Sequence, residues 1–76
     1  MQELKNIIAK NIQECRNACG LTQLELAEKL NYSDNTISRW EKAEITPSVE
    51  TLEQISQLYN IPLESLFKEK IETIAK

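Results

Sequence analysis

Apolar residues recur at intervals of three and four along most of this chain, and this spacing restricts the possible folds more than any other feature of the sequence. Residues spaced in this way share one face of an α-helix, whereas a half-buried strand alternates apolar and polar residues. No segment shows that alternation, and the chain contains one glycine and two prolines to interrupt helices. The sequence therefore predicts an all-α fold.

The first helix is expected to end before Gly20, because glycine is typical of the position just after a helix. Its spacing predicts an inward face made of Leu4, Ile7, Ile8, Ile12 and Cys15.

The sequence TQLE is a capping box, in which Thr22 accepts from the backbone N–H of Glu25 and Glu25 reaches back to the N–H of Thr22. It predicts a second helix from about Gln23 to Leu30. The expected inward residues of this helix are Leu24, Ala27 and Leu30.

The third helix follows a very short turn. Asn31 suits a left-handed turn conformation, and Ser33 is a favourable cap with Asp34 in the first turn behind it. We expect this helix over residues 33–42, with Ile37 and Trp40 packed against the second helix.

Two further helices are expected after the loop that ends at Pro47. Ser48 caps the fourth helix, and Pro62 suits the first turn of the fifth. The fourth should bury Val49, Leu52, Ile55 and Tyr59, with Leu58 on the flank, and the fifth should bury Leu63, Leu66 and Phe67. The sequence thus predicts one domain over residues 1–67, followed over 68–76 by a C-terminal extension that is either helical or frayed.

Length and composition limit the class of protein. At 76 residues the chain forms one small domain, and its 41% hydrophobic content is typical of a globular protein. No apolar run approaches the roughly 20 residues that cross a bilayer, and the first residues lack a secretory signal. We expect a cytoplasmic protein with no membrane contact.

The chain offers few residues for catalysis or metal binding. It has two cysteines and no histidine, whereas a zinc site needs about four ligands. We expect free thiols, with Cys15 facing the core and Cys19 near a helix end. There is also no glycine-rich phosphate loop. The sequence predicts no metal, cofactor or small-molecule ligand, and a protein that is not an enzyme.

The charge balance bears on nucleic-acid binding. Nine Lys and Arg residues against 12 Asp and Glu residues give a net charge of −3 and a pI near 4.9. The strongly basic balance of many nucleic-acid-binding domains is absent. Because the local field at the contact surface decides binding, the net charge does not exclude a DNA-binding role.

The second and third helices form a tight pair, since only about three residues join them and Ala27 permits close approach. The third helix also has a polar outer face. A close pair of this kind inserts one helix into the DNA major groove, although an ordinary helical hairpin gives the same pattern.

Further positions agree with a known family. They are the LTQ opening at 21–23, Ala27, Ile37, the SRWE run at 38–41, and the PS and IPL helix starts at 47–48 and 61–63. Because all these positions agree in register, residues 4–67 resemble the phage-repressor/Cro-type (XRE-like) helix-turn-helix DNA-binding domain. The resemblance implies a compact five-helix, lambda-repressor-like domain whose helix-turn-helix consists of helices two and three.

The resemblance also implies a function. It is that of a sequence-specific transcriptional regulator, expected to be a repressor, which reads the major groove of double-stranded DNA with helix 33–42. Such proteins usually act as homodimers on palindromic operators. The expected dimer face comprises Phe67, Ile71 and Ile74. The alternative is a protein–protein interaction module on the same fold, as part of a longer regulatory protein.

By the same resemblance, Gln23 matches a glutamine that binds a phosphate and braces the recognition helix, and Arg16 and Glu41 match a structural ion pair. The positions that match DNA-facing residues are Asp34, Asn35, Thr36, Ser38 and Arg39.

The chemistry of these residues suits base reading. Arg39 can bind O6 and N7 of guanine, and Asn35 can bind N6 and N7 of adenine. Ser38 and Thr36 can contact a base edge or a phosphate, although Thr36 equally suits a purely structural role at the helix start. Lys42, at the helix end, is expected to contact a phosphate.

Three residues depart from the family pattern. Ala43 stands where a glycine usually follows the recognition helix, and Asn31 replaces the usual turn glycine. Asp34 places an acid on the reading face, where it either accepts from cytosine N4 or weakens phosphate contacts. We therefore expect modest DNA affinity with strong salt sensitivity.

Overall fold

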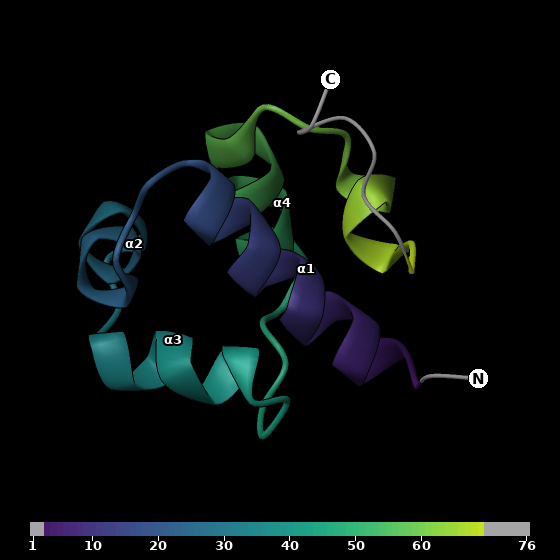
Figure 1. The fold of residues 1–76 in the computed structure, drawn as a ribbon, viewed down its shortest axis with the longest axis horizontal. Helices are drawn as coiled ribbons and strands as arrows, with labels where there is room; N and C mark the ends of the chain where they lie inside the picture. Colours follow the sequence, from purple (N-terminus) through teal and green to yellow (C-terminus); the bar gives the residue numbers. More distant parts are fainter. Residues whose placement is uncertain (1–2, 70–76) are drawn as a thin grey trace.

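The computed structural model describes residues 3–69, which form four α-helices and one short 3-10 helix and contain no strand (Figure 1). The elements are α1 (Leu4–Ala18), α2 (Gln23–Leu30), α3 (Asp34–Glu41), α4 (Val49–Tyr59) and the 3-10 helix η1 (Leu63–Phe67). The predicted all-α architecture is confirmed. The fifth predicted helix is the five-residue η1 rather than an α-helix.

The predicted helix caps are present. The Thr22 hydroxyl accepts from the Glu25 N–H at 3.0 Å, and the Glu25 carboxylate accepts from the Thr22 N–H at 2.8 Å. The hydroxyl groups of Ser33 and Ser48 cap α3 and α4, and each accepts a hydrogen bond from a backbone N–H at 3.2 Å. These side chains satisfy N–H groups that the first turn of a helix leaves without partners.

Left-handed residues end the helices. Asn31 follows α2 with φ 68°, as expected, and Asn60 follows α4 with φ 60°. Ala43 has φ 61° just after α3, although alanine rarely adopts this conformation. The helix therefore ends at Glu41, with Lys42 as its cap, which is one residue earlier than the sequence predicts.

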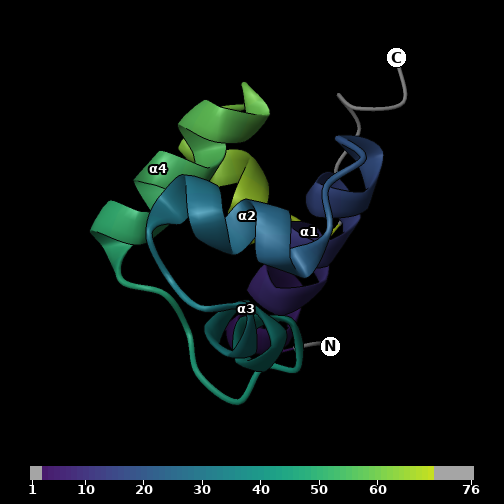
Figure 2. The same cartoon turned by 90° about the vertical axis from the view of Figure 1, so that its left-hand side faces the viewer.

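The core lies where the helices meet around α1. It is built from side chains of all five elements, and the following are fully buried: Ile12, Cys15, Leu26, Ala27, Ile37, Ile55 and Leu66. In the view of Figure 2, α3 is seen end-on beneath α2, and α1 lies behind the pair. This arrangement leaves the side of α3 that faces away from α2 and α1 open to solvent.

Four residues that the sequence places in the core are exposed. Leu4 is 55% exposed, Leu24 is 54% exposed, Val49 is 65% exposed and Phe67 is 36% exposed. The first three occupy the first turn of their helices, and Phe67 is the last residue of η1. In α2 the inward position belongs to Leu26, which is fully buried and which the predicted stripe omits.

A buried polar side chain fastens η1 to α1. The Asn11 amide nitrogen donates to the carbonyl oxygens of Leu66 at 2.8 Å and Lys68 at 2.7 Å, and Asn11 is only 1% exposed. The Tyr59 hydroxyl donates to the Ile12 carbonyl at 3.4 Å nearby. The chain beyond η1 is therefore tied to the middle of α1.

The predicted dimer face cannot be followed as a whole. Phe67 is 36% exposed at the end of η1, so it is only partly covered by the fold. Ile71 and Ile74 lie outside the described residues, as does most of the predicted extension over 68–76. None of the helices formed by residues 3–69 is long and apolar enough to cross a membrane.

Candidate nucleic-acid interface

The two sides of α3 differ sharply. Ile37 and Trp40 point inward, with exposures of 0% and 3%. Among the predicted contact residues, Thr36 and Ser38 are partly buried at the edge of this face, and the exposed ones are Asp34, Asn35, Arg39 and Lys42. The helix thus presents its polar side chains on a surface whose orientation is fixed by the apolar side.

Thr36 has a structural role within the first turn. Its backbone N–H donates to the Ser33 hydroxyl at 3.2 Å, and the two hydroxyl groups lie 3.0 Å apart. This arrangement supports the helix-start interpretation of Thr36. Contact of Thr36 with a base stays a prediction.

Arg39 is held by a residue that sequence reasoning did not single out. Its Nε donates to Glu44 Oε1 at 3.3 Å, and both side chains are about half exposed. Glu44 therefore lies beside the principal candidate for base recognition, just after the end of α3.

A buried polar cluster ties the C-terminal end of α3 to α1. Arg16 on α1 donates from Nε to Glu41 Oε2 at 2.6 Å, and the exposed fractions of the two side chains are 11% and 3%. This hydrogen bond raises the pKa of the Arg16 guanidinium. The ion pair that the resemblance implies is present, so Glu41 is already neutralised inside the protein.

Gln23 joins this cluster from the start of α2. Its amide nitrogen donates to Glu41 Oε1 at 2.9 Å, and the side chain is partly buried. Gln23, the first residue of α2, therefore connects this helix to Glu41, the last residue of α3, in agreement with the bracing role that the resemblance implies. Its contact with a phosphate stays a prediction.

Aromatic contacts support the turn between α2 and α3. The rings of Tyr32 and Trp40 meet edge to face, with centroids 5.0 Å apart and planes at 72°. The Tyr32 hydroxyl lies 3.0 Å from the Thr51 hydroxyl on α4. Trp40 therefore belongs to the core, as the sequence predicts, and Tyr32 connects the turn to α4.

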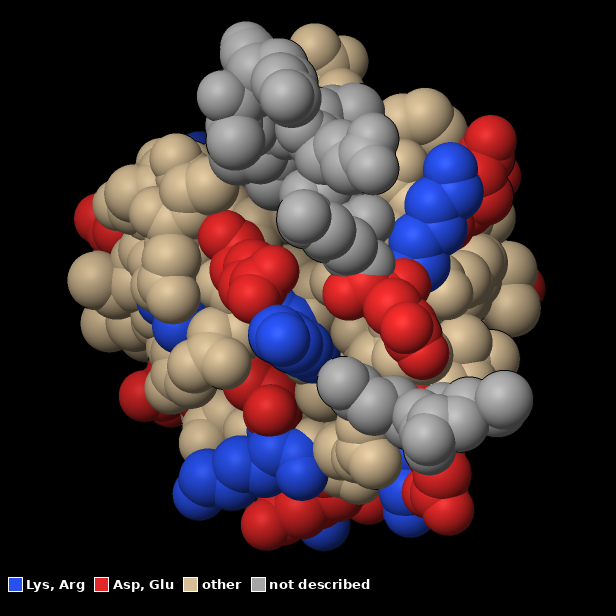
Figure 3. All heavy atoms as spheres, turned by 45° about the vertical axis from the view of Figure 1, so that its right-hand side comes forward, with Lys and Arg blue, Asp and Glu red and all other residues tan. Residues whose placement is uncertain are grey.

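The local charge differs from the charge of the whole chain. Two acidic and two basic side chains are exposed on or just after α3, namely Asp34, Glu44, Arg39 and Lys42. Their formal charges cancel, whereas the chain as a whole carries −3. Figure 3 shows the side of the molecule that lies to the right in Figure 1, where Lys and Arg side chains lie next to Asp and Glu side chains.

The cysteines are free thiols, as expected, with Cys15 buried and Cys19 exposed. Burial raises the pKa of Cys15 to about 11, which keeps this thiol protonated and unreactive at neutral pH. Among residues 3–69, no group of three or more histidine, cysteine or acidic side chains is placed to hold a metal ion.

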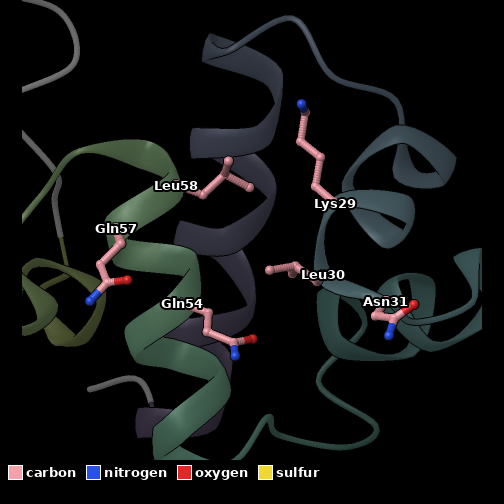
Figure 4. A pocket seen from close by; sticks show the side chains of 6 residues that line it. All are labelled: Lys29, Leu30, Asn31, Gln54, Gln57 and Leu58. Atoms are coloured by element: carbon pink, nitrogen blue, oxygen red, sulfur yellow. The ribbon is translucent and has the colours of Figure 1, made fainter.

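An open hollow lies between α2 and α4, away from the polar face of α3. Leu30 and Leu58 point toward one another across it, with Gln54 below them and Lys29 along its edge (Figure 4). Asn31 and Gln57 complete its lining. It is a shallow gap between helices, and its polar groups do not converge on one point.

A family model described as helix-turn-helix matches residues 12–66, which include every element from the middle of α1 to η1. The chain belongs to the phage-repressor/Cro-type (XRE-like) helix-turn-helix family. In this helix-turn-helix domain, α2 and α3 form the motif itself.

The chain is similar to curated proteins that are named as HTH-type regulators. The transcriptional regulator ImmR of Bacillus subtilis is 39% identical over 59 residues, covering 78% of this chain and 46% of that protein. The transcriptional activator BcrR of Enterococcus faecalis is 34% identical over 68 residues, covering 88% and 33%. An uncharacterized regulator of Archaeoglobus fulgidus is 38% identical over 56 residues, covering 74% and 80%.

The helix-turn-helix domain accounts for only part of the larger relatives, since the chain spans less than half the length of ImmR and BcrR. No solved structure matches the chain significantly.

Two contacts of this helix-turn-helix domain escaped sequence reasoning. The Arg39–Glu44 pair has a spacing of five, outside the usual helical pairs at three and four, and only the left-handed Ala43 brings the two residues together. The Tyr32–Thr51 contact joins separate elements and has no sequence signal.

Proposed function

We propose that the protein is a sequence-specific double-stranded DNA-binding transcriptional regulator whose α3 reads the major groove. The observation that carries the proposal is the exposed polar face of α3 on a helix whose opposite face is locked into the core by Ile37 and Trp40. A rigid helix with outward hydrogen-bonding groups is what base recognition requires. Membership of a family of DNA-binding regulators supports the same function.

Arg39 and Asn35 are the residues that we assign to base edges. A guanidinium can donate to O6 and N7 of guanine, and a carboxamide can both donate to N7 and accept from N6 of adenine. Each such pair discriminates against a wrong base by about 1–3 kcal/mol. The exposure of both residues leaves them accessible to a duplex.

The other candidate residues position the domain on the sugar-phosphate backbone. Gln23 lies at the N-terminus of α2, where unpaired N–H groups favour an anion. Lys42 caps α3 and is exposed. Ser38 and Thr36 supply hydroxyl groups at the edge of the face, and Asp34 accepts from cytosine N4 or tempers the attraction to phosphate.

We propose that the protein binds a palindromic operator as a homodimer, because one helix of eight residues reads too few base pairs alone. The two half-sites would then lie about 34–36 Å apart. Phe67 is the described residue of the proposed dimer face, and Phe67→Ser should lower the solution mass to that of a monomer. An unchanged mass would contradict this assignment.

The regulatory outcome that we propose is repression. One relative is named an activator, so the two outcomes need a direct comparison. A reporter gene placed behind the operator should be less active with the protein than without it, and a rise in reporter activity would show activation instead.

The experiment that tests the function is the selection of bound duplexes from a random DNA pool at two salt concentrations. Wild-type protein should enrich a short palindromic motif, more strongly at low salt. Arg39→Ala should relax one position of that motif. The matched control is Lys29→Ala, which removes the same charge beside the hollow between α2 and α4 and should leave the motif unchanged.

Failure would have a clear form. If folded protein enriches no motif at low salt, DNA reading is contradicted. The alternative, a protein–protein interaction module, would then be preferred. Binding of such a module to its partner protein should persist in the variants Arg39→Ala and Asn35→Ala.

A further inference from the structure

We infer that Glu44 is a positioning residue for base recognition, which holds Arg39 by its Nε and so presents the two terminal nitrogens of the guanidinium to the base edge. The inference rests on the proposed function, since it assigns a second residue to the same reading face. Its starting point is the Nε–Oε1 distance of 3.3 Å between two half-exposed side chains.

The backbone after α3 brings the two residues together. The Ala43 N–H donates to the Trp40 carbonyl at 3.1 Å, and the Glu44 N–H donates to the Arg39 carbonyl at 3.0 Å. With Ala43 at φ 61°, these bonds form a Schellman motif, which folds the chain back over the last turn of the helix. Glu44 is therefore fixed over Arg39 by its own main chain.

The pairing within this motif is unusual in its chemistry. The residues in the positions of Arg39 and Glu44 frequently make an apolar contact in a Schellman motif. Here they are oppositely charged and exposed to about one half. Exposed ion pairs contribute little to stability, so this contact has little effect on whether the helix ends here. Its main effect is on the conformations available to Arg39.

The atoms involved leave the reading function intact. Glu44 uses the Nε of Arg39, and the terminal nitrogens can still bind O6 and N7 of guanine together. A free arginine samples many rotamers, and ordering it opposes binding. A guanidinium already held at one nitrogen loses less freedom when it meets the base.

The charge of Glu44 adds a second effect. An unpaired arginine can bind any phosphate, which gives affinity without sequence information. A carboxylate beside Arg39 offsets part of that attraction and repels the phosphates themselves. Glu44 should therefore lower binding to arbitrary DNA while it sharpens discrimination at the base that Arg39 reads.

The test is a double-mutant cycle between Arg39→Ala and Glu44→Ala, measured on the selected operator and on duplexes with single base changes. Glu44→Ala should reduce discrimination about three- to tenfold at the position that Arg39→Ala relaxes, and should leave the other positions unchanged. Binding to arbitrary DNA should become tighter. In the Arg39→Ala background, Glu44→Ala should no longer alter discrimination at any position.

Two further variants separate position from charge. Glu28→Ala removes the same charge from α2, where Glu28 is exposed at the rim of a second hollow, and it should not affect discrimination. Glu44→Gln retains an acceptor for Nε without the charge, so it should keep more discrimination than Glu44→Ala.

The outcomes distinguish the two proposals. Suppose that the Glu44→Ala variant discriminates between bases as sharply as the wild-type protein, whereas Arg39→Ala relaxes the motif. This result would overturn the inference about Glu44 and leave the proposed function intact. If folded wild-type protein enriches no motif, the proposed function fails and this inference fails with it.

Discussion

Glu41, the last residue of α3, accepts two hydrogen bonds from Arg16 on α1, with Nε at 2.6 Å from Oε2 and Nη2 at 3.1 Å from Oε1. Arg16 also donates from Nη1 to the Leu21 carbonyl at 2.8 Å, in the turn before α2. One guanidinium therefore connects α1, the α1–α2 turn and α3. The orientation of α3 depends on this connection as well as on apolar packing.

Removing one partner of this ion pair should be costly. Glu41→Ala leaves the mostly buried guanidinium of Arg16 without its counter-charge, which should lower the free energy of unfolding by about 3–5 kcal/mol. Urea denaturation followed by circular dichroism measures the loss. Replacing both residues, as Arg16→Met with Glu41→Leu, should recover most of it, and equal losses in the single and double variants would contradict this account.

Alkaline pH should weaken the fold through Cys15. Burial raises the pKa of its thiol from 9.0 to about 11 in the folded protein, so the contribution of the neutral thiol is complete below pH 9 and is lost as the pH rises toward 11. The loss should reach about 2–3 kcal/mol. Cys15→Ala should flatten the stability curve in this window.

Any decrease in the free energy of unfolding of the Cys15→Ala variant at alkaline pH is due to other titrating groups. Burial raises the pKa of the Tyr59 hydroxyl as well, so this group contributes at still higher pH. Equal slopes for the wild-type protein and Cys15→Ala between pH 9 and 11 would refute the assignment to Cys15.

The left-handed residue after α3 predicts a stabilising substitution. Ala43 has φ 61°, a conformation that costs an L-residue about 1–2 kcal/mol, whereas glycine adopts it freely. Ala43→Gly should raise the free energy of unfolding by about 1 kcal/mol, because the greater entropy of unfolded glycine offsets part of the gain.

Gly20→Ala is the matched control for that substitution. Gly20 has φ 73°, and a Cβ added there would meet no atom within 4 Å, so only the backbone conformation opposes the change. It should destabilise by about 1 kcal/mol. Thermal denaturation of both variants checks the pair, and shifts of the same sign would contradict the argument.

Asn11 should be sensitive to loss of its donor. Asn11→Leu has nearly the same size but leaves the carbonyl oxygens of Leu66 and Lys68 without its N–H groups, which should cost about 1–3 kcal/mol. Amide hydrogen exchange should become faster first in η1. Unchanged protection of η1 would show that apolar packing alone holds this helix against α1.

Lys42 and Arg39 should differ in their effects on DNA binding. If Lys42 contacts a phosphate, Lys42→Ala should weaken binding to all sequences alike and reduce the dependence of log affinity on log salt by about 1. Arg39→Ala should instead act mainly at one base pair. Affinity titrations at four salt concentrations on matched and mismatched duplexes distinguish the two roles.

Features set by local chemistry were predictable from the sequence. The capping box at Thr22, the left-handed Asn31 and the bounds of α2 depend on residues within a few positions of one another. The buried pair Ile37 and Trp40 follows from their spacing of three on one short helix. In each case the interacting groups are neighbours along the chain, so their types and spacing carry the information.

Features set by the arrangement of helices were less predictable. Leu4, Leu24 and Val49 have the right residue type, yet each is exposed in the first turn of its helix, and in α2 the buried face is formed by Leu26, Ala27 and Leu30 instead. Asn11 looks like a surface residue until η1 is packed on α1. The partner of Arg39 depends on one left-handed residue, whose conformation alanine does not normally indicate.

The only tryptophan of the chain, Trp40, lies on α3 but faces the core, where it is 3% exposed and meets the edge of Tyr32. Its fluorescence emission should therefore be blue-shifted in the folded protein and should report unfolding directly. A DNA duplex bound to the opposite face of α3 would not touch the indole ring. Any change in that emission on adding an operator would then measure a movement of the helix within the domain, without an attached dye.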